Sequence, residues 1–224
     1  MEAPILIVNF KTYSNATGEE AMALARIHDK VAKETGANIA IAVQPVDICA
    51  IASEVSIPVL GQHFDAVEEG PFTGHITPHS IKAAGAYGSL LNHAERKMEI
   101  NEIQKSIDMA RTLGLFSVVC ADTVYTGNAI TELDPDFVAV EPPELIGGDI
   151  SVCTANPQLI KDAVKMIGTE KLIIGAGIKT KDDVASAISS GASGILLSSG
   201  ITKAIDPEAK LRELVEGLNT SIKC

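Results

Sequence analysis

The sequence predicts an α/β fold, a (β/α)8 barrel that forms a single domain over residues 1–224. Three observations lead to this prediction. Apolar runs of strand length alternate with amphipathic helical stretches from end to end, which is the pattern of βα units around a parallel sheet. Eight such units fit into 224 residues, whereas a doubly wound sheet seldom needs eight parallel strands at this length. No Ser/Gly-rich linker, block of charge or low-complexity tract divides the chain.

Each predicted strand is a short apolar run, and such runs are typical of parallel strands that are buried on both faces. The composition agrees with this interpretation, because 46% of the residues are hydrophobic, only 4% are aromatic, and Trp is absent. The core must therefore be built from aliphatic side chains. The eight runs are Ile5-Phe10, Ile39-Val43, Pro58-Gln62, Ser89-Asn92, Leu115-Cys120, Phe137-Val140, Leu172-Gly175 and Gly194-Leu197.

Several of the helices between these strands have clear start signals. Asn156-Pro157 and Asp206-Pro207 each place a capping residue before a proline at the first helical position. Thr180 begins a similar start, and Thr17 with Glu20 has the spacing of a capping box. The second and third helices are less clearly marked.

The charge balance restricts the partners that this protein can have. Its 18 Lys and Arg residues against 29 Asp and Glu residues give a formal net charge of -11. Such a surface repels nucleic acid and anionic membranes, so we expect neither as a partner. An anionic small molecule would have to be held by local groups, such as backbone N–H groups or one well-placed lysine.

The cysteines and the apolar segments predict a cytoplasmic protein. The four cysteines do not have the spacing of a zinc site, so we expect reduced thiols. No segment has the features of a secretion signal or the length to span a bilayer. The cysteines are Cys49, Cys120, Cys153 and Cys224.

In a barrel of this kind the chemistry lies at the C-terminal ends of the strands. The sixth run ends on Glu141, and a carboxylate at the end of a buried strand is costly unless it is paired or used. Pro142-Pro143 follows, which should exclude helix and form a stiff arm, and Gly147-Gly148 provides a flexible far end. This arrangement fits a general base beneath a lid. The alternative is a solvated loop glutamate after a buried strand.

The first and fourth runs also end on residues of chemical interest. Asn9 and Lys11 lie two positions apart, which places them on the same side of an extended chain. His93 and Glu95 follow the fourth run, and we expect His93 at a helix start, where the N-terminus would keep its imidazole neutral. A surface lysine and a structural histidine are the alternative interpretations.

Small residues follow the seventh and eighth runs, in Gly175-Ala176-Gly177-Ile178 and Ser198-Ser199-Gly200. Such loops let backbone N–H groups approach an anion, and in barrels these two loops commonly bind phosphate. The chain has no GxGxxG motif, no Walker A motif and no acidic cluster suited to a metal. We therefore expect a phosphate site that uses neither metal nor cofactor.

Four segments together resemble the triosephosphate isomerase family: Asn9-Phe10-Lys11, His93-Ala94-Glu95, Glu141 to Gly147, and Ser198-Ser199-Gly200. The short chain and the sequence of the lid look like the compact archaeal type, and the resemblance covers essentially the whole chain. It implies an isomerase of glycolysis and gluconeogenesis. Such an enzyme interconverts dihydroxyacetone phosphate and D-glyceraldehyde 3-phosphate by proton transfer through an enediolate.

The resemblance also implies a role for each residue. Glu141 would be the base, and neutral His93 would polarise the carbonyl group and shuttle protons. Lys11 would stabilise the negative charge of the enediolate with Asn9 beside it, and Glu95 would hold Lys11 in place. The phosphate would be bound by backbone N–H groups around Ile146, Gly147, Gly177, Ser198 and Ser199.

Some positions depart from the bacterial and eukaryotic pattern of that family. Ala94 stands where that pattern has a serine, so one polar contact to the base in the open state should be absent. Glu144 and Ile174 replace the aromatic pair that latches the lid elsewhere, so lid closure must use other contacts. Residues 70–74, within a long predicted loop from Gln62 to Thr77, resemble the family's dimer loop. This implies a homodimer, or a homotetramer as in related archaeal proteins.

Three other interpretations compete with this one. A sugar-phosphate epimerase or an isomerase of aromatic amino acid synthesis would need two acids or a metal set at the strand ends. A catalytically silent barrel that binds triose phosphate would need the phosphate loops but not Lys11, His93 and Glu141 together. A dinucleotide-binding module would need the fingerprint that this chain lacks.

Overall fold

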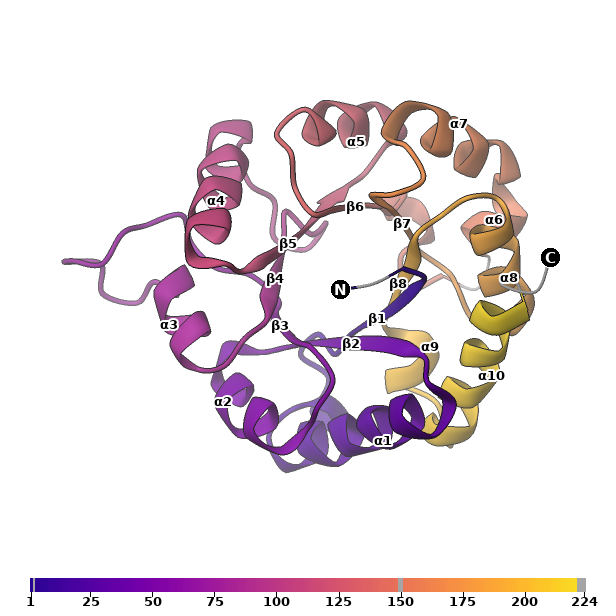
Figure 1. The fold of residues 1–224 in the computed structure, drawn as a ribbon, viewed down its shortest axis with the longest axis horizontal. Coiled ribbons are helices and arrows are strands. Elements are labelled where there is room, and N and C mark those ends of the chain that lie inside the picture. The colour runs from indigo at the N-terminus through magenta and orange to yellow at the C-terminus, as the bar shows by residue number, and fades with distance from the viewer. Residues whose placement is uncertain (2, 149–150, 221–224) are drawn as a thin grey trace.

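The computed structural model describes residues 1, 3–148 and 151–220, and its centre is a closed barrel of eight parallel strands in sequence order (Figure 1). The eight predicted strands are confirmed, with boundaries that differ by at most one residue at either end. The strands are β1 (Ile5–Asn9), β2 (Asn38–Val43), β3 (Val59–Gly61), β4 (Gly88–Leu91), β5 (Phe116–Ala121), β6 (Phe137–Val140), β7 (Leu172–Gly175) and β8 (Gly194–Leu197).

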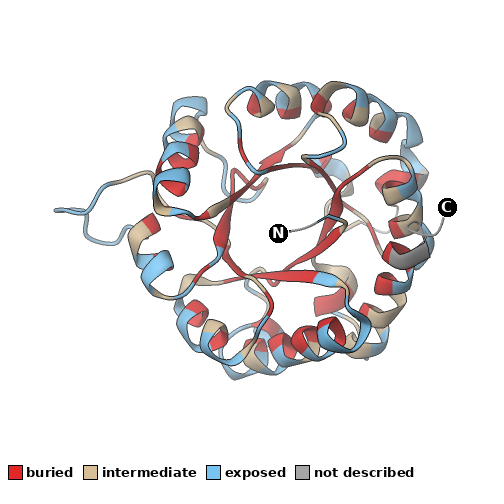
Figure 2. Cartoon of the chain, in the orientation of Figure 1, coloured by how far each residue is buried: buried red, intermediate tan, exposed pale blue. Residues whose placement is uncertain are grey.

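Helices surround the barrel as an outer ring, with their buried faces toward the strands (Figure 2). The α-helices are α1 (Glu19–Thr35), α2 (Pro45–Glu54), α3 (Pro78–Ala83), α4 (Ile100–Leu113), α5 (Val124–Thr131), α6 (Val152–Ala155), α7 (Pro157–Ile167), α8 (Lys181–Ser189), α9 (Ser199–Thr202) and α10 (Pro207–Thr220). Two short 3-10 helices are η1 (Ser14–Ala16) and η2 (Pro143–Leu145). None of the helices in the described ranges combines the length and the apolar character that crossing a membrane requires.

Three of the predicted helix starts are confirmed. The Asn156 side chain accepts a hydrogen bond from the Leu159 N–H at 3.1 Å, and Asp206 caps α10 in the same way through Ala209 at 2.9 Å. Thr180 forms a reciprocal capping box at the start of α8.

The capping box predicted for Thr17 is wrong, because Gly18 is the N-cap of α1. Gly18 has φ 63°, a conformation that turns the chain before the helix and leaves Thr17 outside its first turn. The Thr17 hydroxyl donates instead to the carbonyl of Tyr13 at 3.0 Å and accepts from the Gln44 amide at 2.8 Å. The local spacing was therefore correct for a cap, but the backbone turn decided where the helix begins.

The barrel strands carry two hydrophobic clusters because successive side chains point to opposite faces. Inward-facing residues such as Ile5, Ile7 and Leu90 fill the barrel interior. Outward-facing residues such as Leu6 and Val8 pack against the helices. The interior is a packed core, so it holds the strand ends rigidly.

One long segment leaves the compact body. Residues 62–77 contain neither helix nor strand, which confirms the predicted long loop. Part of this loop projects away from the barrel beside α3 and α4, at the left of Figure 1. We call residues 66–75 the projecting arm. Phe72 within it remains 42% exposed.

Candidate active site

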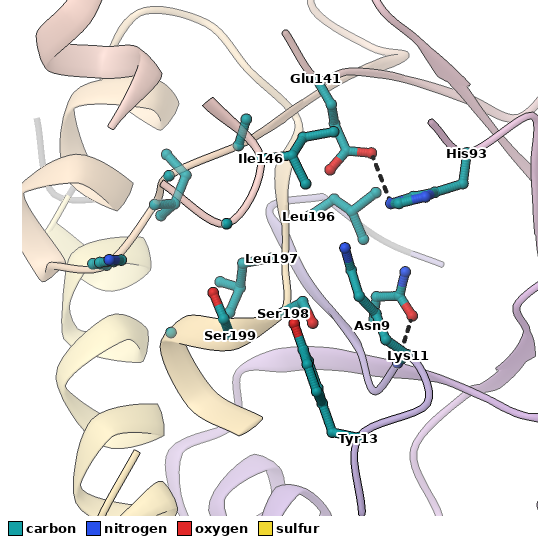
Figure 3. A pocket seen from close by; sticks show the side chains of 16 residues that line it. Asn9, Lys11, Tyr13, His93, Glu141, Ile146, Leu196, Leu197, Ser198 and Ser199 are labelled. Carbon is teal, nitrogen blue, oxygen red and sulfur yellow. Dashed lines mark hydrogen bonds and ion pairs between the residues drawn. The ribbon is translucent and has the colours of Figure 1, made fainter. Parts of the chain in front are cut away.

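The structure brings most of the predicted site residues together in one cavity at the C-terminal ends of the strands (Figure 3). Side chains from the ends of β1 and β6 and from the loop after β4 face the loops that follow β6, β7 and β8. Glu95 does not line this cavity, but its carboxylate binds Lys11, which does. The predicted residues that line the cavity are Asn9, Lys11, His93, Glu141, Ile146, Gly147, Gly177, Ser198 and Ser199.

Glu141 directly follows β6 and is only 6% exposed. Its Oε2 atom has no hydrogen-bond partner among the described residues, whereas the thiol of Cys120 on β5 donates to its carboxylate. Burial raises the pKa of Glu141 to about 7, although the Cys120 hydrogen bond and the charge of Lys11 oppose that shift. At this pKa the carboxylate is partly ionised near neutral pH, so it can accept a proton. It is also a stronger base than an ordinary carboxylate.

The Glu141 side chain lies in space that a larger residue at position 175 would occupy. A Cβ atom placed on Gly175 would lie 2.5 Å from the Glu141 Cγ atom and 2.7 Å from its Oε1 atom. Such contacts are far shorter than van der Waals distances, so glycine at the end of β7 is required by this position of the base. Gly175 therefore leaves the space that the Glu141 side chain occupies.

His93 does not begin a helix, which corrects the prediction from sequence. Helix α4 begins at Ile100, and His93 lies in a turn that is closed by a hydrogen bond from the Arg96 N–H to the His93 carbonyl at 2.8 Å. Burial, and after it the charge of Lys11, lowers the pKa of His93 to about 4. The imidazole is therefore neutral at pH 7 as expected, but the cause is desolvation and not a helix N-terminus.

The proton position on this imidazole follows from its backbone contact. The Glu95 N–H donates to the Nδ1 atom of His93 at 3.1 Å, so Nδ1 is an acceptor and the neutral ring carries its proton on Nε2. This Nε2 atom lies 3.7 Å from Oε2 of Glu141 (Figure 3). The proton donor of His93 and the free oxygen of Glu141 thus face the same small space.

Lys11 reaches the cavity from a turn and not from an extended strand, so the predicted reason for its position is wrong. β1 ends at Asn9, and Lys11 has φ 50°. The Asn9 Oδ1 atom accepts from the Lys11 N–H at 3.0 Å and the Gln62 amide donates to the Lys11 carbonyl at 2.8 Å, which together support this left-handed conformation. The Lys11 ammonium group binds Oε1 of Glu95 at 2.9 Å.

The opposite side of the cavity is lined by small residues and backbone. Gly177 has φ 71°, and α9 begins at Ser199, where the first N–H groups of the helix have no partner within it. Ser198 Oγ is buried and has no hydrogen-bond partner among the described residues. These donors suit an anion such as a phosphate group.

The segment 142–148, which we predicted to be a lid and call the lid below, lies between β6 and the side of the cavity that small residues line. The expectation that Pro142-Pro143 excludes helix is wrong, because η2 begins at Pro143, where the missing N–H of proline is tolerated in a first turn. Leu145 packs against the outer hydrophobic cluster, and the Ile146 side chain lies beside the Glu141 carboxylate (Figure 3). Leu145 thus gives this segment one apolar contact with the outer cluster.

Several residues of the site were missed from the sequence. Cys120 was treated only as a reduced thiol, yet it lies on β5 next to β6 and pairs with Ala139, two residues before Glu141. The predicted strand order already placed the strand that carries Cys120 beside the strand that ends at Glu141, so this contact had a signal in the sequence. Tyr13 also lines the cavity, and its ring lies 4.7 Å from the ammonium group of Lys203. The signal for Tyr13 in the sequence was its position, two residues after Lys11.

Within residues 1, 3–148 and 151–220, no group of three or more His, Cys, Asp or Glu side chains is arranged to hold a metal ion. Cys49, Cys120 and Cys153 are free thiols. Cys224 lies outside the described residues, as does Asp149, which follows the lid glycines. The groups that meet in the cavity are therefore a buried carboxylate, a neutral imidazole, an ammonium group and backbone donors. These can transfer protons and stabilise an oxyanion.

Comparisons with known proteins show which family this chain resembles. The family model described as triosephosphate isomerase matches residues 4–217. The triosephosphate isomerase of Methanobacterium bryantii is 48% identical over 218 residues, which are 96% of this chain and 96% of that protein. The enzyme of Methanothermobacter thermautotrophicus is 47% identical and is matched over 96% of this chain and 95% of its own length.

A solved structure supports the fold. The crystal structure of triosephosphate isomerase from Bartonella henselae matches with a TM-score of 0.71 over 93% of this chain and 98% of that chain. Because the two sequences are only 19% identical, this likeness bears on the barrel and not on its side chains.

Proposed function

The chain belongs to the triosephosphate isomerase family, and from that premise we propose how its residues divide the chemistry. The chain is an isomerase that interconverts triose phosphates, as glycolysis requires. The observation that carries our assignment is the Oε2 atom of buried Glu141, which has no hydrogen-bond partner among the described residues and lies 3.7 Å from the Nε2 atom of His93. A base and a neutral proton donor there face one small substrate from two sides.

Glu141 is the base of the proposed mechanism. Its free oxygen removes a proton from the carbon next to the carbonyl group of dihydroxyacetone phosphate and returns it to the neighbouring carbon. A proton at such a carbon is too weakly acidic for a carboxylate in water, so the enediolate must be stabilised by fixed donors in a cavity that excludes water. The pKa of about 7 makes Glu141 a stronger base than an exposed carboxylate.

His93 and Lys11 stabilise the enediolate. The Nε2–H of His93 donates to the substrate oxygens and can move a proton between them, while the Lys11 ammonium group compensates their charge. Glu95 holds Lys11 through the ion pair of 2.9 Å, and Asn9 holds its backbone. Because the pKa of His93 is about 4, the side chain acts as a neutral imidazole and not as a charged imidazolium.

The remaining residues bind the phosphate group. We assign this role to backbone N–H groups at Ile146, Gly147, Gly177, Ser198 and Ser199, which line the side of the cavity opposite to His93. Because Ile146 and Gly147 belong to the lid, phosphate binding and water exclusion are coupled. We propose no metal and no cofactor for this reaction.

The setting of the enzyme is part of the proposal. We propose that residues 1–224 act as one barrel domain in the cytoplasm, as free Cys49, Cys120 and Cys153 suggest. We also propose a homodimer or homotetramer in which the projecting arm contacts a second copy, since Phe72 within the arm is 42% exposed.

The test is a coupled assay of glyceraldehyde 3-phosphate conversion in the presence of a chelator, with wild type beside Glu141→Gln. We expect fast, chelator-resistant turnover that falls by roughly 10²- to 10⁴-fold in the variant. Unchanged turnover of folded Glu141→Gln would refute the role of Glu141. If neither protein turned over while both bound triose phosphate, the chain would be a binding protein.

A further inference from the structure

Outside the cavity, one carboxylate holds both ends of the projecting arm. The Asp65 N–H donates to the Ile76 carbonyl at 2.8 Å, and the Ile76 N–H donates to Oδ2 of Asp65 at 2.8 Å. The two chain segments that lead into and out of the arm are thus joined at its base. This pairing gives a segment without helix or strand a defined origin.

The same carboxylate is surrounded by basic side chains. Oδ1 of Asp65 accepts from Nη2 of Arg96 at 2.9 Å and lies 3.2 Å from Nε2 of His63, while Oδ2 lies 3.3 Å from Nδ1 of His75. The Asp65 side chain is 18% exposed. Although burial opposes the shift, the hydrogen bonds from Ile76, His63 and Arg96 lower the pKa of Asp65 below its usual value. Asp65 is therefore a charged centre that joins three segments.

One of these segments leads directly to the active site. The backbone N–H of Arg96 closes the turn 93–96 by donating to the His93 carbonyl at 2.8 Å. Within the turn, the Glu95 N–H sets the protonation of the His93 ring, and the Glu95 carboxylate binds Lys11. The Arg96 side chain at the end of this turn is 59% exposed, and its guanidinium group contacts the Asp65 carboxylate.

We propose that Asp65 is a positioning residue for the isomerase reaction. By holding Arg96 it fixes the turn 93–96, and it thereby orients the Nε2 atom of His93 and the carboxylate of Glu95. This inference rests on the roles proposed above for His93 and Glu95. It predicts a separation of effects, because the residues after β7 and β8 that line the active-site cavity are not among those that line the cavity beside Asp65.

The first experiment measures kcat, KM and inhibition by inorganic phosphate for Asp65→Asn. Because small displacements of a catalytic group are costly, kcat should fall roughly five- to thirty-fold. KM and the inhibition constant of phosphate should stay within about twofold, since the phosphate site is untouched. Asp65→Glu, which retains the charge, should recover part of the lost kcat. A variant that merely loosened the fold would change both kcat and phosphate binding.

A double-mutant cycle tests the route through Arg96. Arg96→Gln should lower kcat as much as Asp65→Asn does, and the double variant should be no worse than either single variant, because the two residues act as a unit. Asp134→Asn is the matched control. It removes an aspartate that also pairs with an arginine, Arg111 at 3.3 Å, but at the opposite end of the barrel. Its kcat should equal that of wild type.

Several outcomes would overturn the inference. These are a folded Asp65→Asn protein with kcat within twofold of wild type, losses that multiply in the double variant, or a loss that disappears as the oligomer re-forms at higher protein concentration. If Asp65→Asn does not fold, Arg96→Gln decides alone, since that side chain is exposed. His93→Gln separates the two proposals: an active His93→Gln protein refutes the role of His93, whereas inactive His93→Gln beside active Asp65→Asn refutes only the role of Asp65.

Discussion

The two ends of the barrel consist of the same eight strands, but buried polar groups have different hydrogen-bonding environments at the two ends. At the N-terminal end, Asp136 accepts from the Ser117 N–H at 2.8 Å and from its hydroxyl at 2.9 Å. Aromatic rings cover the same end, with Phe116 5.2 Å from Phe137 and 6.0 Å from Tyr87 between ring centroids. The Asp136 carboxylate is therefore paired by hydrogen bonds, while Tyr87 remains 46% exposed.

The C-terminal end keeps polar groups and backbone in less favourable states. Glu141 and His93 are buried with strongly shifted pKa values, and Glu141 Oε2 is without a hydrogen bond in the described residues. Lys11, Asn92 and Ala176 adopt positive φ values there, although Asp134 shows that the other end also has such a residue. The difference shows that stability is concentrated at one end of the strands and reactivity at the other.

The largest effect should come from Glu141→Gln, which sharpens this comparison by separating activity from stability. Turnover should fall by roughly 10²- to 10⁴-fold because the base is lost. The free energy of unfolding at pH 7.5 should stay equal or rise, because a buried carboxylate with an unpaired oxygen is replaced by a neutral amide. Thermal unfolding and the coupled assay measure the two quantities. A marked fall in stability would contradict our view of the C-terminal end.

The next largest effect is expected at the lid. Gly147 has φ 72°, which proline cannot adopt, so Gly147→Pro should prevent the lid conformation of this structure and lower kcat/KM by roughly ten- to a hundredfold. The fold should persist, because a Cβ at Gly147 would meet no atom within 4 Å. Full activity of Gly147→Pro would remove the lid from the mechanism.

The pH dependence of stability should differ between wild type and Glu141→Gln. The Glu141 pKa rises from 4.5 in the unfolded chain to about 7, so its contribution to stability is complete below pH 4.5 and is lost as the pH rises through 7. On acidification from pH 7 to 5, wild type therefore regains about 2 kcal/mol that the variant cannot regain. Urea unfolding at both pH values tests this, and equal pH slopes would contradict it.

Two histidines act in the opposite direction and provide an internal check. Burial lowers the pKa of both His28 and His93 from 6.5 to about 4, so their contribution is present above pH 6.5 and is lost as the pH falls toward 4. The stability of Glu141→Gln should therefore decline steeply over this range. An additional change of His28 to a residue that does not titrate should flatten that decline.

A smaller effect is expected at the N-terminal end. Asp136→Ala would leave the backbone N–H and the hydroxyl group of Ser117 without their acceptor and should lower the free energy of unfolding by about 1–2 kcal/mol. Turnover should be unchanged because the cavity lies at the other end. A loss of kcat without a loss of stability would show that the two ends are not separated as we describe.

The smallest effect should come from Ala176→Gly. Ala176 has φ 76°, which is strained for a residue with a Cβ atom, so glycine should relieve strain at this end of the barrel. The greater chain entropy of glycine in the unfolded state offsets part of this gain. We expect an increase in unfolding free energy of less than about 1 kcal/mol. A decrease would mean that Ala176 is not strained.

Much of the site could be predicted because its residues follow strands that are individually recognisable. Apolar runs identified β6 and β1, and barrel order then placed Glu141 and Lys11 at the same rim. The environment of each group could not be predicted in this way. The neutral state of His93 was expected from a helix start, but it arises from burial and from the charge of Lys11, which is distant in sequence.

The sequence by itself determined the βα order, the strand positions and the capping of α7, α8 and α10, because these depend on local periodicity and on side chains within a few residues. Tertiary structure decided what depends on groups far apart in the chain. The contact between Cys120 and Glu141, the space that Gly175 leaves for that carboxylate, and the junction of Asp65 with Arg96 exist only once the barrel closes. Burial sets the pKa of the base, and burial is a property of the closed barrel.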